Sequence, residues 1–336
     1  MENLKKIFVV GSSRSGTTMM GRILAKNALV FTFRELHFFG GIWTKNQDKE
    51  LPRKDQINLL SRLLSIQENG IFYKRGSSDF DIISEGLLDE SVKTALDIYE
   101  LFLETITTKN AAQISCEQTP KNLYYIEEII SFFPDAKVIN LVRDQRDVLL
   151  SQKNKWRRRF LGAKEIPLLE ALRAYINYHP ILTSKVWNSS LLYTSRYLDH
   201  SNVKIIKFED LLSNPECIVK EICKFVDIDF QHEMLEVPIV GSSTEDDIRD
   251  EQHIDKSKIN KWKEGGLSNG EIYLSQKFSF KMMDKFGYQR MKFSLPPLYS
   301  IFYLITFPVK LCLAFLFNIH RMGNIAEVIQ KRFFIK

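Results

Sequence analysis

Residues 7–18 are Ile-Phe-Val-Val-Gly-Ser-Ser-Arg-Ser-Gly-Thr-Thr, a short apolar run followed by a turn with two glycines. The run is rich in β-branched residues and ends at Gly11, which is typical of a buried parallel strand. Residues 16–28 then have helical spacing, with apolar side chains along one side. Backbone N–H groups in such a turn point inward, and the helix dipole adds positive potential. The stretch therefore predicts an anion-binding loop.

Two glycines and several hydroxyls give this loop its expected chemistry. Gly11 lets the chain leave the strand sharply, and Gly16 lets the backbone approach a phosphate closely. Ser15, Thr17 and Thr18 can donate hydroxyl hydrogen bonds. The alternative is an ordinary strand–helix turn in which serine and threonine cap the helix.

Strands and helices continue to alternate along the chain. Apolar runs predict further strands at residues 29–33, 112–116, 137–142 and 203–208. Helical spacing predicts helices within 51–108, from 144, over 168–197 with a break or bend at Pro180, over 215–225 and over 272–286. This order favours an α/β fold of the P-loop type, a parallel sheet with helices on both faces, followed by a helical hydrophobic C-terminal tail.

Length and composition bound the remaining possibilities. The 336 residues suit one large α/β domain or two small ones, and the apolar fraction of 44% is typical of a globular protein. The composition changes near residues 295–297, so we expect a domain over 1–292 and a tail over 293–336. The formal charge of +6 favours an anionic ligand if it gathers in a cleft. No basic block alternates with aromatic residues as a nucleic-acid motif would.

Cysteine and histidine spacing predicts no metal site. Cys116, Cys217, Cys223 and Cys312 form no CxxC pair, and the histidines are not placed to complete a set of ligands. A reduced, cytoplasmic type of compartment fits this cysteine usage best. The apolar run after Lys5 and Lys6 is too short for the core of a signal peptide.

The loop departs from the Walker A pattern GxxxxGK[ST] in its charge. Gly11 and Gly16 have the Walker spacing, but Thr17 replaces the lysine and the cation lies inside the loop at Arg14. The strand at 137–142 ends in Arg143, where a Walker B strand would present an aspartate. Both departures disfavour a nucleoside triphosphatase.

The loop resembles the 5′-phosphosulfate loop of sulfotransferases that use 3′-phosphoadenosine 5′-phosphosulfate (PAPS), whose usual form is Pro-Lys/Arg-Ser-Gly-Thr-Thr. Ser13 takes the place of the usual proline. The resemblance implies that Arg14 contacts the bridging oxygen of the donor. It also implies that the 5′-phosphosulfate is held by Ser13, Arg14, Ser15, Gly16, Thr17 and Thr18.

A second donor motif follows the strand at 137–142. Arg143 lies at the strand end, and Ser151 comes two helical turns later, on the same side of the helix. An arginine fork with a hydroxyl suits a terminal phosphate, although a solvated helix start with Asp144 and Asp147 at its N-terminus is the alternative. The pair is similar to the family's 3′-phosphate motif. Residues 207–215 and 258–263 resemble two later family segments, the second of which implies a donor-binding role for Lys261.

Candidate catalytic residues lie in Arg34-Glu35-Leu36-His37-Phe38-Phe39. A glutamate and a histidine two residues apart project together from an extended segment, and a carboxylate can take a proton from an attacking hydroxyl. The alternative is a surface glutamate with His37 packed among the phenylalanines. The run is similar to a segment of heparan sulfate sulfotransferases, which implies that Glu35 is the base and that His37 orients it or the acceptor. By comparison with tyrosylprotein sulfotransferases, Arg34 is a further candidate.

Residues 117–122 look like the family's Glu-Lys-Thr-Pro segment, which faces donor and acceptor. Gln118 replaces the usual lysine, so the electrostatic role of that position is in doubt. Lys121 is a candidate to supply the charge, with a solvated loop cation as the alternative.

Together these motifs predict sulfuryl transfer from PAPS to an acceptor hydroxyl, on a carbohydrate or glycolipid, without an essential metal. Two alternatives stay open: a P-loop nucleotide kinase, and a non-catalytic, membrane-associated protein that keeps the nucleotide pocket. The individual acceptor and the oligomeric state are not legible in the sequence.

The tail from Tyr299 to Ile319 is strongly apolar and approaches the length of a membrane span. Pro308 and Lys310 lie near its middle, where a charge is costly in lipid, and several cations follow it. One interpretation is a terminal helix pair packed on the domain. The other is a helix in the membrane interface, which would place a cytoplasmic protein at the inner face of a membrane.

Overall fold

The computed structural model of the chain describes residues 4–44, 49–72, 79–239 and 248–319. Its main sheet has five strands, in the order β2-β3-β1-β4-β5. All neighbouring pairs in this sheet are parallel. The strands are β1 (Lys5–Gly11), β2 (Val30–Thr32), β3 (Ile114–Glu117), β4 (Lys137–Val142) and β5 (Val203–Lys207). The predicted parallel sheet is therefore confirmed, and each predicted strand is present.

The order of the strands places a topological switch point at the end of β1. From the centre of the sheet, β3 and β2 lie to one side and β4 and β5 to the other. In open α/β sheets, ligands bind outside the carboxyl ends of the strands at such a switch point. Gly11 is level with Leu141 of β4, whereas Phe8 pairs with Glu117, the last residue of β3. The loop after β1 therefore lies where the two halves of the sheet diverge.

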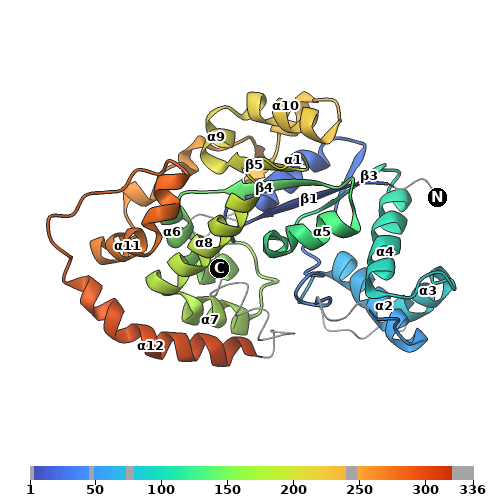
Figure 1. Ribbon diagram of the computed structural model, residues 1–336, viewed down its shortest axis with the longest axis horizontal. Coiled ribbons are helices and arrows are strands. Elements are labelled where there is room, and N and C mark those ends of the chain that lie inside the picture. Colours follow the sequence, from blue (N-terminus) through green and yellow to red (C-terminus); the bar gives the residue numbers. More distant parts are fainter. Residues whose placement is uncertain (1–3, 45–48, 73–78, 240–247, 320–336) are drawn as a thin grey trace.

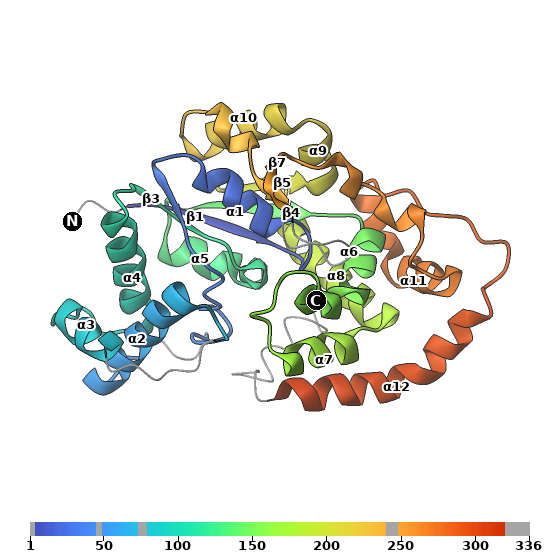
Figure 2. The same ribbon diagram turned by 180° about the vertical axis from the view of Figure 1, so that it is seen from behind.

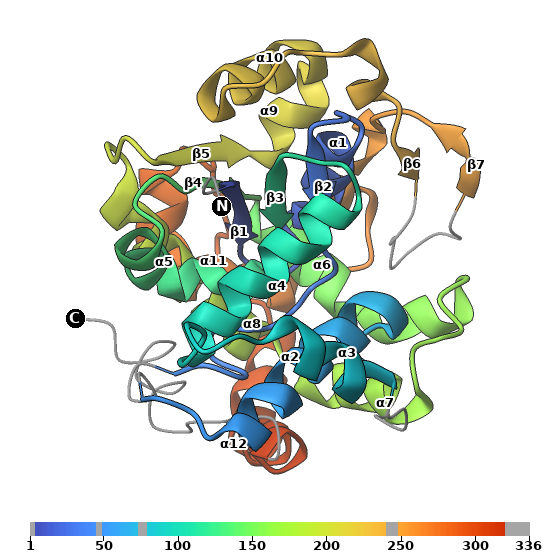
Figure 3. The same ribbon diagram turned by 90° about the vertical axis from the view of Figure 1, so that its right-hand side faces the viewer.

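Helices cover both faces of the sheet (Figure 1). They are α1 (Thr17–Ala25), α2 (Arg53–Asn69), α3 (Asp79–Leu87), α4 (Ala95–Lys109), α5 (Ile126–Phe132), α6 (Gln145–Lys153), α7 (Leu168–Asn177), α8 (Pro180–Thr194), α9 (Phe208–Ser213), α10 (Pro215–Val226), α11 (Asn269–Lys285) and α12 (Tyr299–Asn318). Strands β6 (Pro238–Ile239) and β7 (Ile248–Gln252) form a small antiparallel pair apart from the main sheet, which the sequence did not lead us to expect (Figure 3).

The alternation of side chains along β1 explains the two layers of core. Phe8 and Val10 are buried on one face, in a cluster with residues of α2, α4 and α5. Ile7 and Val9 are buried on the other face, with residues of α1, α9 and α10. Successive strand residues point to opposite faces, so an uninterrupted apolar run is what a strand covered on both sides requires.

Local signals explain where several predicted helical stretches divide. The stretch at 168–197 separates into α7 and α8, and Pro180 occupies the first turn of α8 as the sequence predicted. The stretch at 51–108 separates into α2, α3 and α4, and a capping box of Thr94 and Asp97 starts α4. Gly70, which follows α2, has a φ of 82°, a conformation that glycine adopts without strain.

Helix α12 lies along the outside of the domain beside α7 (Figures 1 and 2). By length and composition, it is the one helix in the described part of the chain that could cross a membrane. The mean hydropathy of its most apolar window is 2.0, and 11% of that window is buried.

Candidate active site

The loop between β1 and α1 depends on its two glycines for different reasons. A Cβ on Gly11 would lie 2.4 Å from the carbonyl oxygen of Leu141, so close pairing with β4 excludes a side chain there. Gly16 has a φ of 96°, and its Cβ would lie 2.3 Å from the ring of Phe208. We expected Gly16 to make room for a phosphate. The structure adds a second reason, because the missing side chain makes room for the ring of Phe208, and the approach of a phosphate stays a prediction.

Internal hydrogen bonds hold the loop in a tight turn. The Ser15 hydroxyl donates to the carbonyl of Ser12 at 2.5 Å, and the Ser15 amide donates to the same oxygen at 3.2 Å. Ser13 and Thr18 are exposed, whereas Thr17 is buried. No side chain caps the N-terminus of α1, so the capping alternative is not what the structure shows. The amides of the first turn of α1 thus have no side-chain acceptor at this end of the helix.

Arg14 joins the two predicted donor motifs. It has a φ of 73°, and its Nε donates to the hydroxyl oxygen of Ser151 at 2.9 Å, across 137 residues of sequence. The Arg143 guanidinium donates to the carbonyl of Arg14 at 3.2 Å and to that of Lys258 at 3.1 Å. It also lies over the Phe208 ring at 4.4 Å from the centroid. The loop, the start of α6 and the late basic segment therefore meet at one place.

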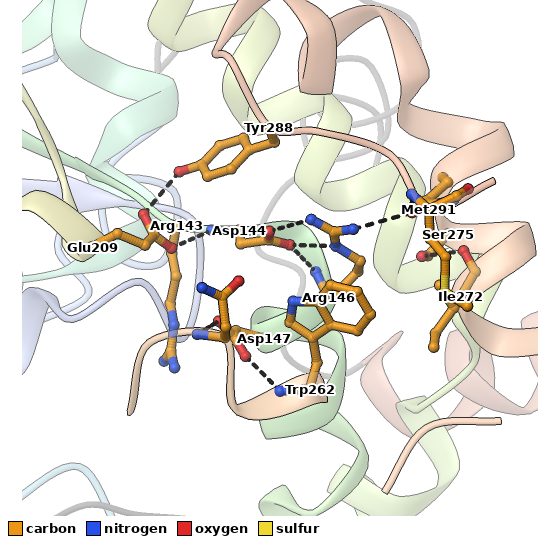
Figure 4. Close-up of polar contacts among 12 residues, drawn as sticks. Arg143, Asp144, Arg146, Asp147, Glu209, Trp262, Ile272, Ser275, Tyr288 and Met291 are labelled. Carbon is orange, nitrogen blue, oxygen red and sulfur yellow. Dashed lines mark hydrogen bonds and ion pairs between the residues drawn. The ribbon is translucent and has the colours of Figure 1, made fainter. Parts of the chain in front are cut away.

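Two carboxylates, Asp144 and Glu209, hold the turn between β4 and α6 that follows Arg143 (Figure 4). The Asp144 carboxylate caps α6 by accepting from the amide of Arg146. It also forms a buried ion pair with the Arg146 guanidinium, with 2.6 Å between Oδ2 and Nη2. Glu209 accepts from the Asp144 amide at 2.8 Å and from the Tyr288 hydroxyl at 3.1 Å. The Arg143 side chain extends away from this pair, toward the loop.

Asp147 connects α6 to residues 258–263. Its two carboxylate oxygens accept from the amides of Asn260 and Trp262, at 3.0 and 2.9 Å. Burial raises the pKa of Asp147 to about 6, although Arg143 acts in the opposite direction. Lys261 belongs to this docked segment, but its Nζ lies 2.8 Å from Glu264. The segment therefore lies beside the predicted donor motifs, and a donor contact of Lys261 itself stays a prediction.

Glu35 and His37 face each other after β2, with 3.4 Å between Oε2 and Nε2. Burial would raise the pKa of Glu35, but the hydrogen bond and charge of His37, together with the charges of Lys155 and Lys121, hold it below its usual value. An ionised carboxylate at neutral pH is what a general base requires. The Arg34 side chain is exposed and lies near Gly70, on the α2 side of the site.

The segment that carries Glu35 is held in place by β3 and its extension. The amide of Leu36 donates to Glu117 and the amide of His37 donates to the Thr119 hydroxyl, both at 3.4 Å. Glu117 also accepts from the Asn122 side chain at 2.6 Å and from the Thr119 hydroxyl. Burial raises the pKa of Glu117 to about 7. A second carboxylate, which the sequence did not single out, therefore supports the turn that presents Glu35.

Lys155 is the second site residue that the sequence did not reveal. Burial, together with repulsion from Arg14, lowers its pKa to about 8, although attraction to Glu35 acts in the opposite direction. Its charge thus acts on both the donor loop and the candidate base. One signal for it was present: Lys155 follows Ser151 by four residues, one helical turn.

The structure also shows the surroundings of Gln118 and Lys121, the two residues of the 117–122 segment considered as sources of positive charge. Gln118 is buried against α1, near Gly21, and its Oε1 has no hydrogen-bond partner. The charge of Lys121 acts on Glu35. Lys121 therefore contributes positive charge on the Glu35 side of the site, whereas Gln118 contributes none.

A sequence model of the sulfotransferase family matches residues 6–232, more than half of the chain. The chain belongs to the sulfotransferase family. An uncharacterized protein of Aquifex aeolicus is 23% identical to this sulfotransferase over 240 residues, which are 69% of this chain and 26% of that protein. The chain thus spans about a quarter of that relative's length.

Two solved structures share the fold of this sulfotransferase. One is a sulfotransferase domain from the curacin biosynthetic pathway, with a TM-score of 0.53 and 18% identity over 86% of this chain and 99% of that domain. The other is a sulfotransferase domain from the olefin synthase of Synechococcus, with a TM-score of 0.51 and 20% identity over 87% and 98%. Among the described residues, no group of three or more His, Cys, Asp or Glu side chains is placed to hold a metal ion.

Proposed function

We propose that this sulfotransferase transfers the sulfuryl group of PAPS to an acceptor hydroxyl. The observation that carries the proposal is the hydrogen bond between Arg14 and Ser151, because it joins the loop expected to bind the 5′-phosphosulfate to the helix expected to bind the 3′-phosphate. PAPS carries anions at both positions. A nucleotide without a 3′-phosphate would leave the second of these sites unused.

Buried polar atoms around the loop support binding of an anion there. The hydroxyl of Ser12 and the Nε of Arg143 are buried and have no hydrogen-bond partner. A buried donor without a partner costs about 1–3 kcal/mol, so a bound phosphate oxygen would relieve that cost. Arg14 and Lys155 add positive charge on the same side.

The proposed reaction uses these residues as follows. The acceptor oxygen forms a bond to sulfur, the bond from sulfur to the bridging oxygen breaks, and its electron pair leaves with adenosine 3′,5′-bisphosphate. Glu35 takes the hydroxyl proton, a contribution of about 10²- to 10⁴-fold. Arg14 and the loop amides stabilise the charge that grows on the bridging oxygen. His37 holds Glu35 in position through their mutual contact.

The acceptor is proposed to be a carbohydrate or a glycolipid. The support is the similarity of residues 35–39 to the corresponding segment of heparan sulfate sulfotransferases. Two solved sulfotransferase domains that share this fold come from a curacin pathway and an olefin synthase, so the acceptor panel should also include hydroxylated acyl chains. A glycolipid acceptor would be met at a membrane, and we propose peripheral membrane contact through the C-terminal tail.

Donor binding and transfer can be tested in sequence on the full chain. Calorimetry should show that adenosine 3′,5′-bisphosphate binds more tightly than ATP. Labelled PAPS should then transfer sulfate to a member of the acceptor panel, and Glu35→Gln should bind the bisphosphate normally but lose transfer. Preference for ATP would favour a kinase. Bisphosphate binding without turnover on any acceptor would favour a non-catalytic protein.

Metal dependence provides a separate test of the mechanism. The donor has no triphosphate to shield, and the proposed charge stabilisation comes from Arg14 and backbone amides. We expect transfer to continue in the presence of a chelator. Loss of transfer with a chelator and its return with Mg²⁺ would contradict this part of the proposal.

A further inference from the structure

Helices α7 and α12 together form an exposed apolar surface, here called the α7–α12 face. Leu168, Leu169 and Leu172 of α7 and Phe302, Ile305 and Val309 of α12 define it, and these side chains are 47–71% exposed. Isolated apolar side chains are normal on a protein surface, but several large ones exposed on two helices that pack together indicate an interaction site. Each of the two helices supplies three of these six side chains.

Hydrogen bonds along its length hold α12 flat against the domain. Arg173 donates from Nε to the carbonyl of Phe317 at 2.8 Å, and the Asn318 side chain donates to that of Asn177 at 2.7 Å. Nearer the start of α12, the Nε2 atom of His179 lies 3.0 Å from the Tyr303 carbonyl oxygen. These contacts tie α12 to the α7–α8 region near both of its ends.

Lys310, the charge that would be costly inside a bilayer, is directed toward α7. Its Nζ lies 5.1 Å from the centre of the Tyr175 ring, and its side chain is partly buried. The apolar side chains of α12 are therefore presented without this cation at their centre. A helix with one apolar face and a cation turned to the flank suits an interfacial position better than a span across the membrane.

A line of contacts leads from this face to the active site. Tyr175 meets Trp156 edge to face, with 6.2 Å between ring centroids. Trp156 is the neighbour of Lys155, whose charge acts on Arg14 and Glu35. Both belong to the short 3₁₀ helix η2 (Lys155–Phe160), which packs against α7. The candidate catalytic residues are thus connected to the apolar face through one short segment.

The charges around the face indicate which partner it fits. Residues 157–159 are three arginines, of which Arg157 is exposed. Helix α12 contains no acidic residue, and the single acidic residue of α7, Glu170, is paired with Arg173. The sequence beyond α12 adds Arg321, Lys331, Arg332 and Lys336. Apolar side chains bordered by cations match the acyl chains and anionic head groups of a bilayer.

We propose that the α7–α12 face docks on an anionic membrane surface and thereby holds the η2 side of the active site toward the lipid. The proposal extends the tail contact proposed above, because it assigns half of the contact to α7 and fixes the orientation of the site. A second copy of this chain is the competing occupant, and the test below separates the two.

The test uses the full chain and sedimentation with vesicles of phosphatidylcholine, with or without phosphatidylglycerol. We expect binding to the anionic vesicles and little binding to phosphatidylcholine alone. Leu169→Ser/Leu172→Ser in α7 and Ile305→Ser/Val309→Ser in α12 should each reduce the vesicle affinity about tenfold or more. Ile82→Ser/Ile83→Ser in α3 removes exposed isoleucines elsewhere and should leave binding unchanged.

Each variant is first checked for bisphosphate binding, which reports folding of the donor site independently of the membrane. A normal vesicle affinity of the α7 variant would overturn the proposal, even if deletion of α12 weakened binding. The proposal would also be overturned if the native chain did not bind vesicles and light scattering showed that it is a dimer which the α7 or α12 substitutions convert to a monomer. Vesicle sedimentation needs no PAPS turnover, so its outcome does not depend on that of the transfer assay.

Discussion

Gly16 has two structural reasons to lack a side chain, its positive φ and the nearby ring of Phe208. We expect Gly16→Ala to destabilise the protein by about 1–3 kcal/mol, because both strain and overlap must be relieved. Bisphosphate binding should weaken as the loop shifts. Urea unfolding and calorimetry measure the two effects.

Gly86→Ala is the matched control for this change. Gly86 lies in α3 with open space around its Cβ position, so alanine there should be neutral or stabilising, by about 0.5–1 kcal/mol. Equal effects of the two substitutions would contradict the role given to Phe208.

Glu117 gives the stability of the protein a specific pH dependence. Burial raises its pKa from 4.5 to about 7, so the folded state holds a proton that the unfolded state releases. The stabilisation from this group is complete below pH 4.5 and is lost as the pH rises to 7. The free energy of unfolding of the native chain should therefore fall by up to about 3 kcal/mol over this range, relative to that of Glu117→Gln.

Chemical denaturation at a series of pH values measures that difference. Glu90→Gln changes an exposed glutamate and should follow the native chain throughout. Parallel curves for the native chain and Glu117→Gln would show that Glu117 is ionised in the folded state. Transfer activity of Glu117→Gln should also fall, because the Glu117 carboxylate of the native chain accepts a hydrogen bond from the Leu36 amide, next to His37.

At the scale of elements, the attachment of residues 258–263 to α6 depends on a single carboxylate. Asp147 accepts from two amides of that segment, and Arg143 accompanies it by binding the Lys258 carbonyl. Asp147→Ala should leave both amides without their acceptor and cost about 1–3 kcal/mol. Hydrogen exchange at the amides of Asn260 and Trp262 should accelerate, and the affinity for the bisphosphate should fall.

Asp199→Ala removes an exposed carboxylate elsewhere and serves as the comparison. If exchange at the two amides were the same in both variants, the segment would be held by other contacts, such as Trp262 against Arg146.

At the scale of the whole molecule, the proposed donor site and the helices that α12 packs against are formed by different parts of the chain. The residues of the proposed donor site come from the loop 11–18, α6 and the 258–263 segment, whereas α12 packs on α7, α8 and α11. We expect a chain of residues 1–292 to bind the bisphosphate with the affinity of the full chain. Its thermal unfolding should occur at a lower temperature, because the surfaces that α12 covers become exposed.

Calorimetry and thermal unfolding of the two chains test this prediction. A shortened chain that folds but binds the bisphosphate poorly would show that α12 supports the site through α7 and Lys155. Residues 1–292 would then not be a functionally independent domain.

The sequence by itself determined the strands of the main sheet, most of the helices around it and the motifs that suggest its chemistry. The strand, loop and helix at residues 5–25, the strand before Arg143 and the break at Pro180 were predicted because periodicity, glycine and proline act over a few residues. The parallel sheet followed from their alternation. Glu35 and His37 could be named together because they lie two residues apart.

Only the tertiary structure decided which of these residues meet. Arg14 reaches Ser151 across 137 residues, and the charge of Lys155, just beyond the end of α6, acts on both Arg14 and Glu35. The raised pKa of Glu117 and the role of Gly16 beside Phe208 are consequences of burial and packing between distant segments. The apolar tail was visible in sequence, but whether it lies along the domain depends on contacts with α7. Such contacts are set by how elements pack, which short-range patterns do not encode.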